Sequence, residues 1–416
     1  MNIASINKKS INSFYIVYLL FGIQLISFVP TYLNASAQIF LWFANIISFA
    51  LSLIIILTSL DRIPKSKKVS IPLLIFLILY SLRMMYDLFI NRIYTNTFPN
   101  PTSYLIYLYG LCLLPALAIF CMRQVNYDWV LKWSYTLLAI IILLSLANNL
   151  IFGNIIADED VGETSLRAGA NKTIGALAFG HLGVSFSILS FYRYMYQKKS
   201  KLFLSGIALG IIVIFMSGSR SPLISLFISV YILIAVRKGF FKIAFITGLV
   251  VLPLVAFWDN IINFFSTVDN KLIYRLVDAI KNKKYSGRDI LYEQVIKQIN
   301  NSPFFGDAFL VTEGKMKGFY PHNIILESLM VTGVFGTIFL FIWIYNIFKK
   351  GFIVLKDNQK HGWIFLLFLQ FFAFGLFSKS FYTNQNLWYY SFLLLNYYWV
   401  VYENNKSKKN SITQLT

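Results

Sequence analysis

Long apolar runs recur along almost the whole of this 416-residue chain, and each is close to the length needed to cross a lipid bilayer. A membrane-spanning helix needs about 20 consecutive apolar residues. Hydrophobic residues make up 57% of the sequence and charged residues only 13%, which is about half the charged share of a soluble domain. The sequence therefore predicts an all-α polytopic membrane protein, and it excludes soluble globular, fibrous, disordered and disulfide-scaffold classes.

The apolar runs predict twelve transmembrane helices. The seventh and eighth runs are short and meet at Ser217–Pro222, a Ser- and Gly-rich stretch that predicts a tight helical hairpin. The expected ranges are 13–30, 36–59, 70–90, 104–122, 130–151, 173–192, 202–217, 222–236, 243–258, 324–348, 363–382 and 387–402.

The basic residues predict how these spans are oriented. The chain has 37 Lys and Arg against 17 Asp and Glu, giving a net charge of +20. Cytoplasmic loops of membrane proteins are enriched in Lys and Arg, and with twelve spans both termini lie on the same side. The short loops on the other side contain only Arg92, Arg167, Lys172 and Arg220. We therefore expect cytoplasmic termini, and we attribute much of the charge to topology and none of it to a nucleic-acid partner.

One connection is far longer than the others and divides the chain. Loops longer than about 12–15 residues are usually functional or disordered. In this one, Ser286–Asp289 resembles a capping box, and Leu291, Val295 and Ile299 follow at helical spacing, which predicts an ordered extracytoplasmic element. The expected organisation is spans one to nine at 1–258, a large periplasmic loop at 259–323, and the last three spans with a cytoplasmic tail at 324–416.

Four basic residues on the predicted outer side are candidates for function, because a charge placed in the membrane is costly. They are Arg167, Arg220, Arg288 and His322. Arg167 and Arg220 have a plain alternative as interfacial anchors. Arg288 opens the predicted loop helix, where a cation opposes the helix dipole, and a bound anion would remove that conflict. His322 begins a span directly after a proline, a poor position for a histidine that only contacts lipid.

Other polar residues have weaker interpretations. Lys379, near the outer end of the eleventh span, either snorkels to the interface or adds to the same basic site. His181, within the sixth span, fits a helix-packing hydrogen bond better than catalysis. The acidic run from Asp158 to Glu163 is best explained as a solvated loop, and acceptor or ion binding there stays open.

Several common catalytic signatures are missing from the sequence. It has no phosphate-binding Walker lysine loop, no dinucleotide fingerprint, no His-Glu-x-x-His and no Asp-x-Asp pair for a nucleotide-bound metal. The candidates instead favour a cationic site without metal or cofactor. In such a site, arginines stabilise a diphosphate leaving group and a histidine accepts a hydroxyl proton.

Three motifs follow one another along the chain in an informative order. The first is Ser217–Arg220, the second is Gly287-Arg288 followed by Asn301–Gly306, and the third is Pro321–Glu327 with Gly333 and Gly336. With the large loop between them, these motifs resemble the O-antigen polymerase/ligase superfamily. Its members are bacterial inner-membrane glycosyltransferases with many spans and a large periplasmic loop. The shared order runs roughly from Arg167 to Gly336.

This resemblance implies a sugar transfer on the periplasmic side of the inner membrane. The donor would be an oligosaccharide linked to undecaprenyl diphosphate, with membrane lipid around it and a flippase and chain-length regulator of the same pathway as further partners. Arg220 and Arg288 would bind the diphosphate, with Arg167 a looser match, and His322 would activate the acceptor hydroxyl.

Two further residues, Asn323 and Lys379, are assigned to substrate binding. Glu327 also matches the family motif. It lies about 140° around a helix from His322, however, so we expect it to serve packing or to support the site residues, and not to act on the same proton.

The resemblance leaves the type of transfer open. The Tyr320–Glu327 run together with Pro303–Gly306 looks more like the polymerases, which transfer a growing chain onto a new lipid-linked repeat unit. A ligase, which transfers the finished chain to lipid A–core, is the main alternative. A protein O-oligosaccharyltransferase is less expected, because those chains extend further at the C-terminus. A twelve-span transporter or flippase is a rival of another class, although carriers generally have two related halves and 1–208 shares no motif with 209–416.

Overall fold

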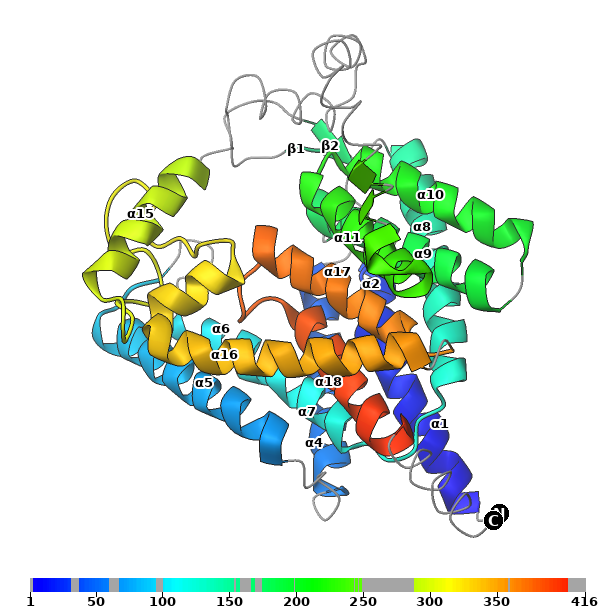
Figure 1. The fold of residues 1–416 in the computed structure, drawn as a ribbon, viewed down its shortest axis with the longest axis horizontal. Helices are drawn as coiled ribbons and strands as arrows, with labels where there is room; N and C mark the ends of the chain where they lie inside the picture. Colours follow the sequence, from blue (N-terminus) through cyan, green and yellow to red (C-terminus); the bar gives the residue numbers. More distant parts are fainter. Residues whose placement is uncertain are drawn as a thin grey trace. The chain divides into compact units, whose positions relative to one another are not determined.

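The computed structural model is helical over most of the residues that it describes (Figure 1). The ninth expected span, 243–258, falls almost wholly outside these residues, and so does the first half of the expected loop, up to Gly287. The described residues are 3–30, 37–59, 67–94, 100–152, 155–157, 166–168, 174–197, 199–242, 244–245, 247–248, 288–357 and 360–402.

The N-terminal helices follow the first five expected apolar runs. Three of them contain π-helical turns, which occur mostly as short insertions in α-helices. The elements are α1 (Ile3–Val17), η1 (Tyr18–Gly22), α2 (Ile23–Ile26), α4 (Ala37–Leu57), α5 (Lys67–Met85), η3 (Tyr86–Ile90), α6 (Pro101–Leu105), η4 (Ile106–Leu113), α7 (Leu114–Cys121) and α8 (Tyr127–Phe152).

The later helices follow the remaining described runs and the predicted loop helix. The elements are α9 (Ala176–Tyr196), α10 (Lys201–Ser217), α11 (Arg220–Lys238), α15 (Arg288–Asn301), α16 (Ile324–Asp357), α17 (Trp363–Phe377), α18 (Gln385–Tyr397) and η6 (Tyr398–Tyr402). The turn expected at Ser217–Pro222 is confirmed: Gly218, whose φ of 60° suits glycine, caps α10, and α11 begins two residues later. The tight hairpin expected there is not confirmed, because α10 and α11 each pack against α9 instead of along one another.

One short strand pair is an exception to the all-helical expectation. β1 (Ile155–Ala157) pairs antiparallel with β2 (Leu166–Ala168), so that Ile156 lies opposite Arg167. The two strands flank the acidic run, whose own residues lie outside the described ranges. The pairing gives the backbone at both ends of that run hydrogen-bond partners.

Seven helices within the described ranges are long and apolar enough to cross a membrane. The other expected spans coincide with shorter or more polar helices or with undescribed residues, so the count of twelve and the orientation stay predictions. The seven are Lys8–Ile26, Ile39–Leu57, Ile71–Ile90, Pro101–Cys121, Tyr127–Ile151, Arg220–Lys238 and Ile324–Asp357.

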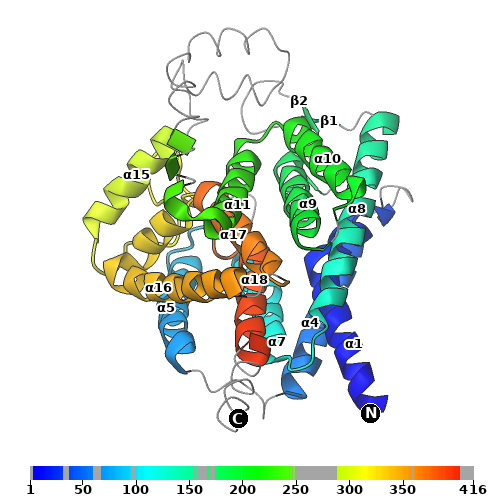
Figure 2. The ribbon, with the colours of Figure 1, turned by 45° about the vertical axis from the view of Figure 1, so that its right-hand side comes forward.

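The chain folds into two compact units, each made of three segments. In the first unit, α9 packs against both α10 and α11, and α1 packs against α8; these neighbours can be followed in Figures 1 and 2. α9 is buried almost all round. The first unit comprises Met1–Ser48, Gln124–Lys284 and Val354–Ala373, and the second comprises Phe49–Arg123, Tyr285–Ile353 and Phe374–Thr416.

The long helix α16 of the second unit is broken at Gly333. There φ is 62° and ψ is −169°, a combination reached essentially only by glycine. The break frees backbone amides that an intact helix would use internally. The amide of Val334 donates to the carbonyl of Pro303 at 2.8 Å, and that of Phe335 donates to the carbonyl of Phe304 at 3.1 Å. The segment Pro303–Gly306, called the Pro-Phe-Phe-Gly segment below, is thus bound through its backbone at the break in α16.

Side chains of α5 and η3 also bind the backbone at the end of this segment and just after it. Arg83 donates to the carbonyls of Gly306 and Asp307, at 2.9 and 2.7 Å. The carboxylate of Asp87 accepts from the backbone N–H of Phe309 at 2.6 Å. These bonds satisfy carbonyls and an amide that regular secondary structure does not use, and they hold the chain between α15 and α16 in one conformation.

Candidate active site

Ser378 in the second unit joins two of the predicted catalytic residues. Its hydroxyl accepts a hydrogen bond from Nη2 of Arg288 at 3.3 Å, and its backbone carbonyl lies 3.2 Å from Nδ1 of His322. Ser378 is itself buried, whereas Arg288 and His322 are half-buried and reachable from outside. The guanidinium and the imidazole therefore lie beside one another on a fixed support, 34 residues apart in sequence.

The contact of His322 with Ser378 fixes its tautomer. A backbone carbonyl can only accept a hydrogen bond, so Nδ1 of the neutral imidazole carries the proton and Nε2 carries the lone pair. The ring of Tyr320 lies 4.2 Å from that of His322, centroid to centroid. With Nδ1 held in this way, Nε2 is the nitrogen that can take a proton from a hydroxyl.

His322 also has a strained backbone. Its φ is 55°, in the left-handed region that costs a residue other than glycine about 1–2 kcal/mol. The neighbouring residue shows why the strain persists: Asn323 caps α16, its side-chain oxygen accepting from the amides of Ile325 and Leu326 at 2.9 and 3.1 Å. This turn sets the direction of the imidazole. The assignment of Asn323 to substrate binding stays a prediction.

Arg288 is the first residue of α15, as the sequence predicted. The helix is held by an apolar face on which Leu291 and Val295 are buried against Val311 and Met330. The expected spacing of Leu291, Val295 and Ile299 is therefore confirmed as the packing face. Because a cation at a helix N-terminus lies near the positive end of the dipole, the side chain and the first-turn amides together suit an anion.

Glu327 serves the packing of this region. It is fully buried; the hydroxyl of Tyr80 donates to its carboxylate, and the backbone N–H of Phe381 donates to it at 3.2 Å. These bonds connect α16 to α5 and to the turn before α18. Both partners use the carboxylate as an acceptor, which supports the packing role expected for Glu327.

The remaining predicted arginine of the hairpin lies in the first unit. Arg220 is half-buried at the first residue of α11. Its neighbour Ser221 lies 3.3 Å from Nε2 of His181, measured from its hydroxyl oxygen, and Gln370 donates to the carbonyl of His181 at 2.8 Å. His181 thus connects α9, α11 and α17, which supports its expected packing role.

Two further predicted site residues are Arg167 and Lys379. Arg167 is the middle residue of β2, opposite Ile156. Lys379 directly follows Ser378, and its ammonium lies 5.8 Å from the centre of the Phe374 ring. Within the described ranges, no group of three or more His, Cys, Asp or Glu is placed to hold a metal ion. The absence of a metal requirement nevertheless stays a prediction.

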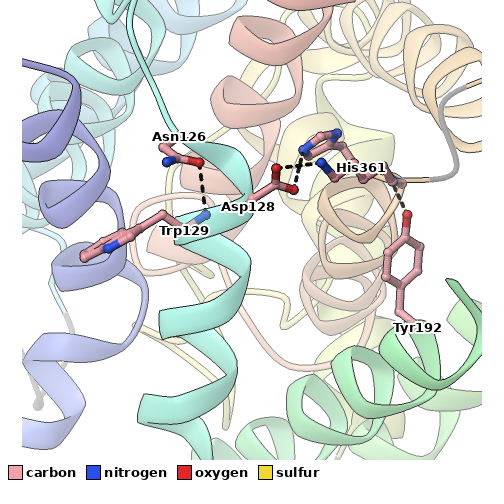
Figure 3. Close-up of polar contacts among 7 residues, drawn as sticks. Asn126, Asp128, Trp129, Tyr192 and His361 are labelled. Atoms are coloured by element: carbon pink, nitrogen blue, oxygen red, sulfur yellow. Dashed lines mark hydrogen bonds and ion pairs between the residues drawn. The ribbon is translucent and has the colours of Figure 1, made fainter. Parts of the chain in front are cut away.

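A separate polar cluster in the first unit surrounds the α16–α17 connection (Figure 3). Lys360 donates to Asp128 at 2.7 Å, and Nε2 of His361 lies 3.5 Å from the other oxygen of that carboxylate. The hydroxyl of the buried Tyr192 accepts from the amide of Gly362 at 3.0 Å. Burial lowers the pKa of His361 to about 4, against the opposite effect of Asp128.

Comparison with protein families bears on the segment that holds most of these residues. Residues 205–341 match the family model described as O-antigen ligase. This segment is similar to the O-antigen ligase family. Among curated proteins, no sequence matches the chain.

The matching segment covers roughly a third of the chain and supports the superfamily resemblance over those residues. It contains Arg220, Arg288, His322 and Asn323, and it excludes Arg167 and Lys379. The match supports a transferase-type membrane enzyme of O-antigen or polysaccharide assembly, and it does not separate a polymerase from a ligase.

The residue that the sequence did not point to is Ser378. A serine in a short turn carries no charge, no spacing pattern and no resemblance motif. The only available signal was its position beside Lys379, at the end of an apolar run.

Proposed function

We propose that this protein is a membrane glycosyltransferase that polymerises lipid-linked oligosaccharide repeat units into O-antigen or a related surface polysaccharide. The donor is an oligosaccharide on undecaprenyl diphosphate, and the reaction takes place on the periplasmic side of the inner membrane. The observation that carries the proposal is that Ser378 binds both Arg288 and His322, and thereby holds an arginine next to a histidine of fixed tautomer. Arg288 and His322 lie within the segment that matches the O-antigen ligase family, and Ser378 follows it.

In the proposed reaction, the acceptor hydroxyl loses its proton to Nε2 of His322 as its oxygen bonds to the anomeric carbon of the donor. The bond from that carbon to the diphosphate oxygen breaks, and the electron pair leaves with the lipid diphosphate. Arg288 stabilises the negative charge that develops on the leaving group, because guanidinium groups bind phosphate oxygens in bidentate fashion. The role of Arg220 as a diphosphate ligand comes from the family resemblance alone and stays a prediction.

A ligase is the second candidate, favoured by the description of the matching family model. Both reactions use the same bond changes and differ in the acceptor. In a polymerase the acceptor is a sugar hydroxyl of the next lipid-linked repeat unit, whereas in a ligase it is a sugar of lipid A–core.

Deletion of the gene separates these candidates when the lipopolysaccharide is examined on a silver-stained gel. A core carrying one repeat unit without a ladder supports the polymerase. A bare core with long polymer accumulating on the lipid carrier supports the ligase instead. An unchanged ladder would refute both and favour a transporter or another glycan pathway.

Complementation with point variants tests the residues. Arg288→Ala and His322→Asn should each abolish polymer at normal protein level in the membrane; asparagine is chosen because it tolerates positive φ yet is no base. Lys317→Ala, which removes an exposed charge from the same loop, is the matched control and should restore the ladder. Near-normal polymer from either site variant contradicts the assignment.

A further inference from the structure

A polar groove of about 540 Å³ lies on the second unit, along one side of α15. Its volume falls in the range of sites that bind small molecules, about 300–1,000 Å³. Side chains from three segments line it: the residues that follow η3, the C-terminal two thirds of α15, and the loop that follows the Pro-Phe-Phe-Gly segment. The lining side chains used below are Asn91, Glu293, Lys297, Asn301, Asp307 and Glu313.

The floor of the groove is held rigid by amide side chains of α15. Gln298 is buried; its oxygen accepts from the amide of Thr312 at 3.1 Å, and its nitrogen donates to the carbonyl of Leu310 at 3.2 Å. Gln294 accepts from the amide of Met316 at 3.1 Å. These bonds fix the loop against the helix, so the groove is formed before any ligand arrives and binding requires little ordering.

The chemistry of the walls suits a ligand rich in hydroxyl groups. Carboxylates accept hydrogen bonds, the ammonium of Lys297 donates them, and the amides of Asn91 and Asn301 do both. A sugar hydroxyl is both donor and acceptor, so it can be matched at any of these positions. The walls are predominantly polar, unlike the membrane-facing side chains of the same unit, which argues against a hydrocarbon chain as the occupant.

The charge of the groove walls indicates which class of sugar can bind. The groove is lined by three acidic side chains, Glu293, Asp307 and Glu313, and by the basic side chain of Lys297. This balance is negative, although the chain as a whole has a net charge of +20. A uronic acid or another anionic sugar would meet like charges, whereas a neutral or amino sugar would not.

We propose that this groove binds the sugar residues of the oligosaccharide, and that it accepts neutral or basic sugars and disfavours acidic ones. The proposal rests on the proposed function and gives it a specificity determinant. α15 has 14 residues and is therefore about 20 Å long. Arg288 stands at its first residue, while the groove extends from Glu293 to Asn301, so one helix carries both the proposed diphosphate ligand and the proposed sugar subsite.

Binding of free oligosaccharides to the full-length protein in detergent tests the groove without any glycosyl transfer. The probes are trisaccharides without lipid or diphosphate: neutral N-acetylated chitotriose and maltotriose, basic chitosan trimer and acidic trigalacturonate. Saturation-transfer NMR should detect binding of the neutral or basic probes, and at least tenfold weaker binding of trigalacturonate. Absence of binding by every neutral and basic probe, or equal binding of trigalacturonate, overturns the proposal.

Two adjacent asparagines provide a matched pair of variants. Asn301 lines the groove, while Asn300 is exposed on α15 and does not line it. Asn301→Ala should weaken trisaccharide binding about fivefold to tenfold, the loss expected for one hydrogen bond, and Asn300→Ala should leave it unchanged. Glu313→Gln should reduce the discrimination against trigalacturonate. Equal binding by the two asparagine variants would contradict the assignment of the groove as the sugar-binding site.

Arg288→Ala separates this proposal from the proposed function. The trisaccharides lack a diphosphate, so this variant should bind them as the wild type does while making no polymer. If the trisaccharides bind in the groove but deletion of the gene leaves the polysaccharide unchanged, the glycosyltransferase assignment is wrong and sugar binding in the groove is still supported. If polymer synthesis depends on Arg288 but no trisaccharide binds, only the proposal of sugar binding in the groove is wrong.

Discussion

Replacing Gly333 with alanine should undock the Pro-Phe-Phe-Gly segment from α16. Alanine at φ 62° and ψ −169° costs about 1–3 kcal/mol in backbone strain, and its Cβ would lie only 2.5 Å from the amide nitrogen of Phe305. Relief of that overlap requires the segment to move, which breaks the bonds from Val334 and Phe335 at about 1 kcal/mol each. The expected loss of local stability is therefore about 3–5 kcal/mol.

Limited trypsin digestion measures this loss directly. Lys315 and Lys317 are exposed in the loop that continues from the docked segment, and cleavage after them depends on local opening. When opening is rapid relative to cleavage, the rate follows the population of the open form. A loss of about 3 kcal/mol should thus speed cleavage at these two lysines on the order of a hundredfold, as followed by mass spectrometry of the released peptides.

The control is Gly110→Ala in η4, where the nearest atoms to an added Cβ are 3.9 Å away. Alanine in a helix is more favourable than glycine by up to about 1 kcal/mol, so this variant should be cut as the wild type is. Cleavage of Gly333→Ala at the wild-type rate would refute the docking argument. Since α16 begins two residues after His322, the same variant should also lose polymer formation.

Three further predictions concern contacts seen in the two units. Ser378→Ala should weaken donor binding through Arg288 while keeping the carbonyl that orients His322, so KM for the lipid-linked donor should rise severalfold with little change in kcat in a reconstituted assay. Tyr192→Phe removes the acceptor of the Gly362 amide and should cost about 1–3 kcal/mol, whereas Lys360→Ala, which breaks an exposed ion pair, should cost less than about 1 kcal/mol; denaturant unfolding compares them. Because the pKa of folded His361 is about 4 and that of an unfolded histidine is about 6.5, the unfolded chain binds more protons between these values, so stability should fall as pH drops from about 6.5 to 4; His361→Asn should flatten that slope, and an unchanged slope would contradict it.

The sequence predicted the parts of the fold that depend on local pattern. Apolar runs predicted the helices, Ser217–Pro222 predicted the turn between α10 and α11, and the spacing of Leu291, Val295 and Ile299 predicted both α15 and its packing face. Each of these follows from residues close in sequence. The β1–β2 pair escaped prediction because three-residue strands have too short a pattern to distinguish from a loop.

Contacts between distant segments could not be predicted in the same way. The support of Arg288 and His322 by Ser378 joins positions 56 and 90 residues apart, and it uses a hydroxyl and a backbone carbonyl. A backbone carbonyl is present at every residue and leaves no trace in the sequence. The tautomer of His322, on which its role as a base depends, is therefore a property of the fold alone.

The motifs that carry the family resemblance are of two kinds: some are required by the architecture, and others are proposed to take part in the chemistry. Pro303–Gly306 and Gly333 occur together because the backbone of one enters the break in the other, which is a requirement of architecture. Enzymes with different acceptors can share that architecture, so these motifs identify the scaffold and leave the acceptor open. The roles proposed for Arg220, Arg288 and His322 belong to bond-breaking chemistry that a polymerase and a ligase would share. The acceptor must instead be selected by surfaces outside these motifs, where a polymerase and a ligase can differ.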